Sequence, residues 1–131
     1  MLIKPDGLEK KVVGKIIDRL EQEQLKLAAL KVMNPSRAWL DEFYSVHRGK
    51  PFFESFIEFM MSGPSVAMVW KGEDAISRVR SIMGATDSRL AEKGTLRNLY
   101  GTDNRRNLVH GSDSQESAER EIKVIFGNEK I

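Results

Sequence analysis

The sequence predicts an α+β fold in which helices cover a small β-sheet. Four short apolar segments have the pattern of strands, and they fall at residues 1–3, 25–33, 66–70 and 122–126. Between them, apolar residues recur at helical spacing, first at residues 12–22. Strands and amphipathic helices that share one short chain favour a sandwich in which the sheet packs under helices.

Turn and capping residues set the expected limits of the elements. The first apolar segment stops at Lys4-Pro5-Asp6-Gly7, which has the composition of a turn. Ser36 is expected to cap a helix that ends before Gly49. The segment 66–70 is almost continuously apolar, so it is expected to be a central strand buried on both faces. Further helices are expected at residues 52–60, 72–83 and 114–121.

Residues 84–109 show little periodicity and form a long connection by ordinary standards. Such connections are usually functional or disordered. This one carries Thr86, Arg97 and the run Asn104-Arg105-Arg106-Asn107. We therefore expect it to be a ligand-binding loop.

Composition indicates an ordinary globular protein. The chain has 131 residues, 40% of them hydrophobic and 31% charged, and we expect one domain over residues 1–131. A net charge of +2 does not predict a polyanion partner, although the 21 basic side chains still permit a local cationic pocket. Cysteine is absent, and no apolar run approaches a membrane span or a signal segment. We expect a cytoplasmic protein with no stable nucleic-acid partner and no membrane contact.

The stretch from Asn107 to Glu121 has the composition of a phosphate site. His110 precedes Gly-Ser, and Asp113 is expected to cap the following helix, with Glu116 completing a capping box. A helix N-terminus near His110 would favour an anion. An imidazole with an ordinary pKa near 6.5 keeps a lone pair at neutral pH, so His110 is a candidate nucleophile. Taken alone, it can equally be a satisfied loop side chain, and His47 is expected to lie on a helix surface.

The run Asn107-Leu-Val-His110-Gly-Ser112-Asp113-Ser114, with Glu121 behind it, resembles the active-site signature of the nucleoside diphosphate kinases. The resemblance spans almost the whole chain. It also includes Ile3-Lys4-Pro5-Asp6-Gly7 and further motifs at residues 48–53, 62–70, 84–87 and 94–97. It implies a ferredoxin-like βαββαβ core with a four-stranded antiparallel sheet.

The resemblance also implies an activity. Members of this family move the γ-phosphate of a nucleoside triphosphate, usually ATP, to a nucleoside diphosphate by a ping-pong mechanism. By this resemblance His110 is transiently phosphorylated, Glu121 and Ser112 orient its ring, and Lys4 and Tyr44 belong to the catalytic set. Broad base tolerance is expected where stacking replaces recognition of the base edges.

Further positions correspond to the nucleotide-binding residues of the family. Contacts with phosphates and sugar are expected from Lys4, Tyr44, Arg80, Thr86 and Arg97, ribose contacts from Lys4 and Asn107, and base stacking from Phe52. Guanidinium groups suit phosphate oxygens and keep their charge. Mg²⁺ is expected as a partner of the bound triphosphate, with Asp113 as a candidate ligand. The resemblance also implies a homo-oligomer, a tetramer or a hexamer.

Some positions depart from the family pattern. Ser88 and Lys93 stand where many relatives have proline, which predicts a less rigid connection. Asn104, on the other face of the base in the family, offers less apolar contact. The chain starts directly at the expected first strand, where relatives usually have several more residues; a clipped chain and an unusually short strand are the alternatives.

Two other functions are alternatives to this activity. The first is a catalytically silent nucleotide-binding regulatory module of the same fold, which is disfavoured because every matched catalytic position is filled. The second is an RNA-binding sheet, which would need paired aromatics on a central strand. The segment 66–70 does not offer that pair.

Overall fold

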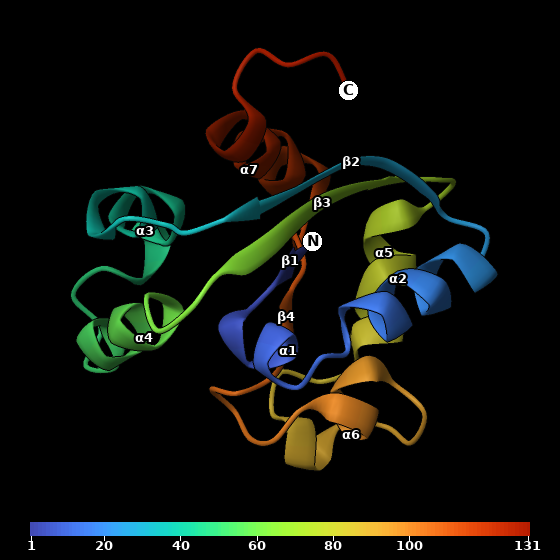
Figure 1. The fold of residues 1–131 in the computed structure, drawn as a ribbon, viewed down its shortest axis with the longest axis horizontal. Coiled ribbons are helices and arrows are strands. Elements are labelled where there is room, and N and C mark those ends of the chain that lie inside the picture. Colours follow the sequence, from blue (N-terminus) through green and yellow to red (C-terminus); the bar gives the residue numbers. More distant parts are fainter.

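The computed structural model describes residues 1–131, and its centre is one four-stranded sheet. The strands are β1 (Leu2–Ile3), β2 (Lys26–Met33), β3 (Ser65–Lys71) and β4 (Val109–His110). They lie in the order β2-β3-β1-β4, and every neighbouring pair is antiparallel. With α2 (Val13–Gln22) and α5 (Ala75–Met83) as crossovers, the strands follow the order βαββαβ. This confirms the expected ferredoxin-like α+β fold (Figure 1).

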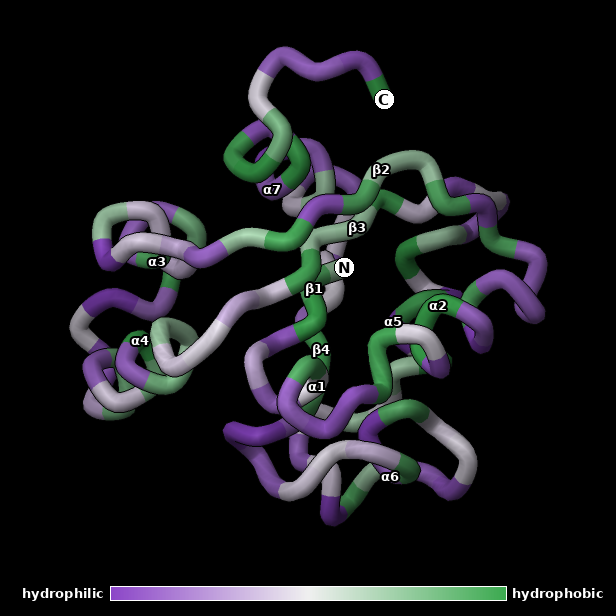
Figure 2. Tube along the Cα trace, viewed as in Figure 1, coloured by the Kyte–Doolittle hydropathy of each residue, from purple (hydrophilic) through white to green (hydrophobic).

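The sheet separates two apolar cores. In the first core, Val66, Met68 and Trp70 of β3 pack with α2 and α5. The alternate residues Ala67 and Val69 belong to the second core, on the opposite face, with α3 (Arg37–Phe43), α4 (Phe53–Met60) and α7 (Gln115–Phe126). Strand side chains alternate between faces, so a strand covered on both sides is apolar throughout. Figure 2 shows the hydrophobic strands running through the middle of the molecule.

The expectation for the last strand was wrong. Residues 122–126 belong to α7, in which Ile122, Val124, Ile125 and Phe126 pack on the second core. An apolar run of this length fits a buried helix face as well as a strand. The fourth strand is β4, whose two residues pair with β1. The cap of α7 also differs, because Ser114 rather than Asp113 accepts a hydrogen bond from a backbone amide, that of Ser117, at 3.0 Å.

Two segments expected to be irregular contain helices. The turn-like residues after β1 form α1 (Pro5–Glu9), which starts with a proline and has an acidic residue in its first turn, both typical of a helix start. The long connection contains the 3₁₀ turn η2 (Ser88–Leu90) and α6 (Leu96–Tyr100), which Thr95 caps. A further 3₁₀ turn, η1 (Ser45–His47), lies between α3 and α4. None of the helices is both long and apolar enough to cross a membrane.

Candidate active site

A cavity of about 1220 Å³ lies where distant parts of the chain meet. It is bounded by the end of β1, the segment from α3 to α4, the long connection and the start of α7. Almost all the site residues expected from the sequence line it: Lys4, Tyr44, Phe52, Arg80, Thr86, Arg97, Asn107, His110, Asp113 and Glu121. Ser112 is the exception, and it reaches the site through its hydrogen bond to Glu121.

His110 is held by a carboxylate. Its Nε2 atom lies 2.6 Å from Oε1 of Glu121, which also accepts a hydrogen bond from the Ser112 hydroxyl at 3.1 Å. A carboxylate can only accept, so neutral His110 carries its proton on Nε2. The other ring nitrogen, Nδ1, has no hydrogen-bond partner within the protein and therefore presents a lone pair.

The charges of this pair suit a nucleophile. Burial lowers the pKa of His110, although the hydrogen bond and charge of Glu121 act in the opposite direction. Burial alone would raise the pKa of Glu121, but its bonds with His110 and Ser112 outweigh that effect and lower the pKa. At neutral pH the arrangement is thus a neutral imidazole beside an ionised carboxylate.

Aromatic rings enclose the imidazole. The rings of Phe43 and Tyr44 meet that of His110 edge-on, with centroid distances of 5.3 Å and 5.7 Å. The Tyr44 hydroxyl is buried without a hydrogen-bond partner, and burial raises its pKa. Tyr44 therefore keeps its proton and has a donor to offer to a bound molecule.

The segment that carries His110 is anchored to the start of the chain. Nζ of Lys4 donates to Oδ1 of Asn107 at 2.8 Å, and both residues are buried. Leu108, also buried, has a positive φ of 78°, which non-glycine residues rarely adopt. Its amide donates to Oδ2 of Asp6 at 3.0 Å, and its carbonyl accepts from the amide of Lys4 at 2.9 Å. Asp6 is thus a positioning residue, a role that neither its expected place in a turn nor the motif around it predicted.

Arg97 has a structural role as well as a place in the cavity. Its guanidinium donates to the carbonyls of Asn107, Gly84 and Val109 at 3.1, 2.8 and 2.8 Å. Three of its five N–H groups are used in this way, which leaves two for a ligand. Burial and the charge of Arg80 lower the pKa of Arg97 to about 10, so it remains charged at neutral pH.

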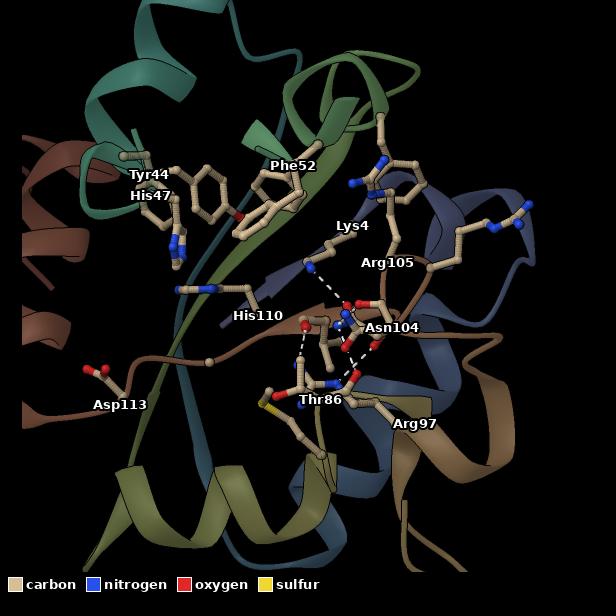
Figure 3. A pocket seen from close by; sticks show the side chains of 18 of the residues that line it. Lys4, Tyr44, His47, Phe52, Thr86, Arg97, Asn104, Arg105, His110 and Asp113 are labelled. Carbon is tan, nitrogen blue, oxygen red and sulfur yellow. Dashed lines mark hydrogen bonds between the residues drawn. The ribbon is translucent and has the colours of Figure 1, made fainter. Parts of the chain in front are cut away.

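Arg80 and Thr86 are exposed at the same end of the cavity. One N–H of Arg80 donates to the carbonyl of Gly111 at 3.2 Å. The Thr86 carbonyl accepts from Nδ2 of Asn107 at 3.0 Å, and no intramolecular hydrogen bond uses its hydroxyl. Figure 3 shows Thr86 and Arg97 on the side of the cavity away from Phe52. These residues therefore provide a cationic, hydrogen-bonding end to the cavity.

The opposite end is aromatic. Phe52 is 44% exposed, so its ring is free to meet a ligand. His47, expected on a helix surface, also lines the cavity, with its ring 5.8 Å from that of Phe52 and 6.3 Å from that of Tyr44. Its spacing of three residues from Tyr44 is the signal that places both rings on one side of the turn.

The protein provides no preformed metal cage. No group of three or more His, Cys, Asp or Glu side chains gathers in the structure. Asp113 is the exposed carboxylate beside the site, and hydrogen bonding from Ser117 and the charge of Arg80 help to lower its pKa. One ionised carboxylate fits a cation such as Mg²⁺ that is bound chiefly through a ligand's phosphates and water.

Known proteins share this sequence and fold. The sequence profile described as nucleoside diphosphate kinase matches residues 1–131. The nucleoside diphosphate kinase of Staphylothermus marinus is 53% identical over 131 residues, which are 100% of this chain and 93% of that protein. A crystal form of the Aquifex aeolicus nucleoside diphosphate kinase has a TM-score of 0.94 at 49% identity, covering 97% of this chain and 92% of the other. The halophilic enzyme of Halobacterium salinarum, in complex with CDP, has a TM-score of 0.93 at 43% identity, covering 97% and 85%.

Fold and site together are those of an enzyme that transfers phosphate. The sheet order, the imidazole held by a carboxylate and the cationic cavity all agree with this class. The chain belongs to the nucleoside diphosphate kinase family, which confirms the resemblance seen in its sequence.

Proposed function

We propose that this protein transfers the γ-phosphate of a nucleoside triphosphate, usually ATP, to a nucleoside diphosphate through a phosphohistidine at His110. The observation that carries the proposal is the state of the imidazole. Glu121 binds Nε2, while Nδ1 is unpaired in a residue that lines the cavity. Attack of the Nδ1 lone pair on the γ-phosphorus forms the N–P bond, and the bond to the leaving nucleoside diphosphate breaks. The reverse step delivers the phosphoryl group to a second nucleoside diphosphate.

The shape of the cavity supports a nucleotide lying along it. Arg80, Thr86 and Arg97 would bind the phosphates at the cationic end, since guanidinium and hydroxyl groups suit phosphate oxygens. Lys4 and Asn107, which already bond one another, would bind the ribose hydroxyls. Phe52 would stack on the base, and stacking tolerates every base. The Halobacterium salinarum relative was solved with CDP, which is a ligand of this class.

Lys4 and Tyr44 would also contribute to catalysis. The ammonium of Lys4 can neutralise charge on the transferring group. The free hydroxyl of Tyr44 can donate to a phosphate oxygen or to the phosphorylated ring. Ser112 acts through Glu121 as a positioning residue. Mg²⁺ would arrive with the triphosphate and supply charge neutralisation there, with Asp113 as its protein ligand.

We also propose a homo-oligomer, a tetramer or a hexamer, built from single-domain protomers over residues 1–131. Strand β2 is an edge of the sheet, and it exposes Leu30 and Val32 by 44% and 62%. An apolar edge strand is a surface that soluble proteins usually cover. A cytoplasmic location is proposed with the activity, because nucleoside triphosphates are abundant there.

The direct test is incubation with γ-labelled ATP and Mg²⁺, followed by analysis of the label on the protein. Label that is lost in acid and stable in alkali is expected, and His110→Ala should abolish it. His47→Ala is the matched control because His47 is the other histidine of the chain and lines the same cavity, and it should still be labelled. A catalytically silent nucleotide-binding module would bind ATP without label, and that result would refute the proposal.

A further inference from the structure

Six arginines line the cavity, and one of them differs from the rest. Arg80, Arg97 and Arg120 donate to backbone carbonyls. Arg89 and Arg106 form ion pairs with Asp87 and Asp103, at 2.7 Å and 3.3 Å. The guanidinium of Arg105 has neither a hydrogen bond nor an ion pair, although the residue is partly buried. It therefore faces the cavity with all its donors free.

The backbone that carries Arg105 is fixed. Oδ1 of Asp103 accepts hydrogen bonds from the amides of Arg105 and Arg106, at 3.0 Å and 2.7 Å. The carbonyl of Arg106 accepts from the amides of Thr102 and Asp103 at 2.7 Å and 3.3 Å. The carboxylate of Asp103 forms an ion pair with the side chain of Arg106 and not with that of Arg105. A turn with a fixed backbone thus presents one free guanidinium to the cavity. This reduces the backbone entropy that is lost when the guanidinium binds a ligand.

The side chain of Arg105 points to the aromatic end of the cavity. In Figure 3 it extends from the 103–107 segment to the same side as Phe52, away from Thr86 and Arg97 and away from His110. Its charge is among those that lower the pKa of Lys4 to about 8, after burial, which is the largest cause, and Arg97. Arg105 therefore lies farther than Lys4 from the cationic end of the cavity, on the side of Phe52.

We propose that Arg105 binds the nucleobase by stacking its guanidinium plane on the face opposite Phe52, where its neighbour Asn104, which the family resemblance puts on that face, offers little apolar contact. This rests on the proposed function, in which Phe52 covers the first face. A planar cation over an aromatic face is favourable, and arginine stacks better than lysine because its charge is delocalised over a plane. Arg105 would then add affinity for every base and most for purines, whose aromatic face is larger.

The test separates base contact from phosphate contact by using two kinds of ligand. Dissociation constants are measured by titration calorimetry for ADP, GDP, CDP and UDP, and for ribose 5-diphosphate, which has the phosphates without a base. The variants are Arg105→Ala, which removes the group, and Arg105→Lys, which keeps the charge without the plane. Lys93→Ala is the control, because it removes one exposed positive charge outside the cavity.

Arg105→Ala is expected to weaken nucleoside diphosphate binding by roughly two- to thirtyfold, with purines affected more than pyrimidines. Ribose 5-diphosphate should bind within twofold of wild type, Arg105→Lys should lie between wild type and Arg105→Ala, and Lys93→Ala should match wild type. An equal loss for ribose 5-diphosphate would place Arg105 on the phosphates and overturn the proposal. Full rescue by lysine, or a loss confined to GDP, would overturn the stacking geometry.

The same variants are assayed for label on His110. Absence of label in the wild-type protein would refute the proposed function, while the binding comparison would still decide whether Arg105 contacts the base. Label together with unchanged nucleotide affinities in both Arg105 variants would refute the base contact alone.

Discussion

The Nε2 atom of His110 lies 2.6 Å from Oε1 of Glu121, although one residue is in β4 and the other in the middle of α7. The contact fixes the ring by a nitrogen that takes no part in the proposed bond formation. It also ties the orientation of the proposed nucleophile to the packing of α7 on the second core.

Replacing Glu121 with Gln should slow phosphorylation of His110. The amide oxygen can still accept from Nε2–H, but the bond no longer involves a charged group. Hydrogen bonds to charged groups contribute about 1.5–3 kcal/mol and neutral ones about 0.5–1.5 kcal/mol, so a loss of about 1–1.5 kcal/mol should slow the rate roughly five- to tenfold. Single-turnover labelling with γ-labelled ATP measures this. Ser112→Ala, which leaves the direct contact in place, should cost less, and a larger effect of Ser112→Ala would contradict this assignment.

The acid limb of the pH–rate profile should move down in the same Glu121→Gln variant. The reaction needs the neutral imidazole, so the rate falls as pH drops through the pKa of His110, which burial lowers below its ordinary value. Glu121 favours the protonated ring and so partly offsets that effect. Without the charge of Glu121 the pKa of His110 falls further. The Glu121→Gln variant is slower, but it holds its own maximal rate down to a lower pH. Acid limbs that coincide in the two proteins would show that Glu121 does not set this pKa.

An alkaline limb is expected from Lys4. Burial, followed by the charges of Arg97 and Arg105, lowers its pKa to about 8, so the free enzyme loses this positive charge as pH rises through that value. Because kcat/KM reports the free enzyme, it should fall above about pH 8, while kcat should fall only at higher pH since bound phosphates raise the pKa. Arg105→Ala removes one neighbouring charge and should move the kcat/KM limb to higher pH. If Arg105→Ala leaves the pH of this limb unchanged, the limb reports the titration of a group other than Lys4.

The central elements of the fold could be predicted because their patterns are long enough to have a period. The helix at Val13–Gln22 and the strand at Ser65–Lys71 appear at their expected places. Strand β4 has only two residues, so no alternation can reveal it, and its pairing with β1 depends on contacts between distant segments. The apolar residues of Ile122–Phe126 fit either a strand or a buried helix face, and packing on the sheet decides between them.

The same limit applies to the site. The motif around His110 identified the residues that a family shares, and the structure brings them to one cavity. Asp6 lies in a motif that the family shares but that assigns it no role, and Arg105 lies in no such motif. Asp6 matters because of an amide 102 positions away, and Arg105 because its neighbour Arg106, and not Arg105 itself, is paired with Asp103. Which of two adjacent arginines remains free depends on side-chain geometry in the folded protein, and the sequence pattern does not predict it.

Arg97→Lys should reduce stability as well as nucleotide binding. The guanidinium satisfies three backbone carbonyls from a side chain that is 7% exposed, and an ammonium cannot reach all three with the same geometry. Loss of one or two such bonds in a buried place should lower the free energy of unfolding by about 2–4 kcal/mol. Urea denaturation measures this. Arg48→Lys, at a more exposed side chain with one bond to a carbonyl, is the matched control and should change stability little.

The backbone at Leu108 offers a test in which two effects compete. Its φ of 78° favours glycine, so Leu108→Gly would relieve strain of about 1 kcal/mol. The side chain is fully buried in the first core, however, and deleting a buried leucine costs about 2–5 kcal/mol. Because the lost burial outweighs the relieved strain, Leu108→Gly should be less stable than wild type in urea denaturation.

Asp6 then separates the position of His110 from the stability of the core. Asp6→Ala leaves the buried amide of Leu108 without an acceptor, which should cost about 1–3 kcal/mol of unfolding free energy. Because the same segment carries His110, a shift of the order of an ångström should also slow labelling of the histidine, by up to about a hundredfold. Asp6→Asn keeps an acceptor of the same shape and should recover most of the rate. Asp18→Asn, on the exposed face of α2, is the control for loss of a carboxylate. If Asp6→Ala lost stability while labelling His110 at the wild-type rate, the hydrogen bond to Leu108 would serve the fold and not the position of the nucleophile.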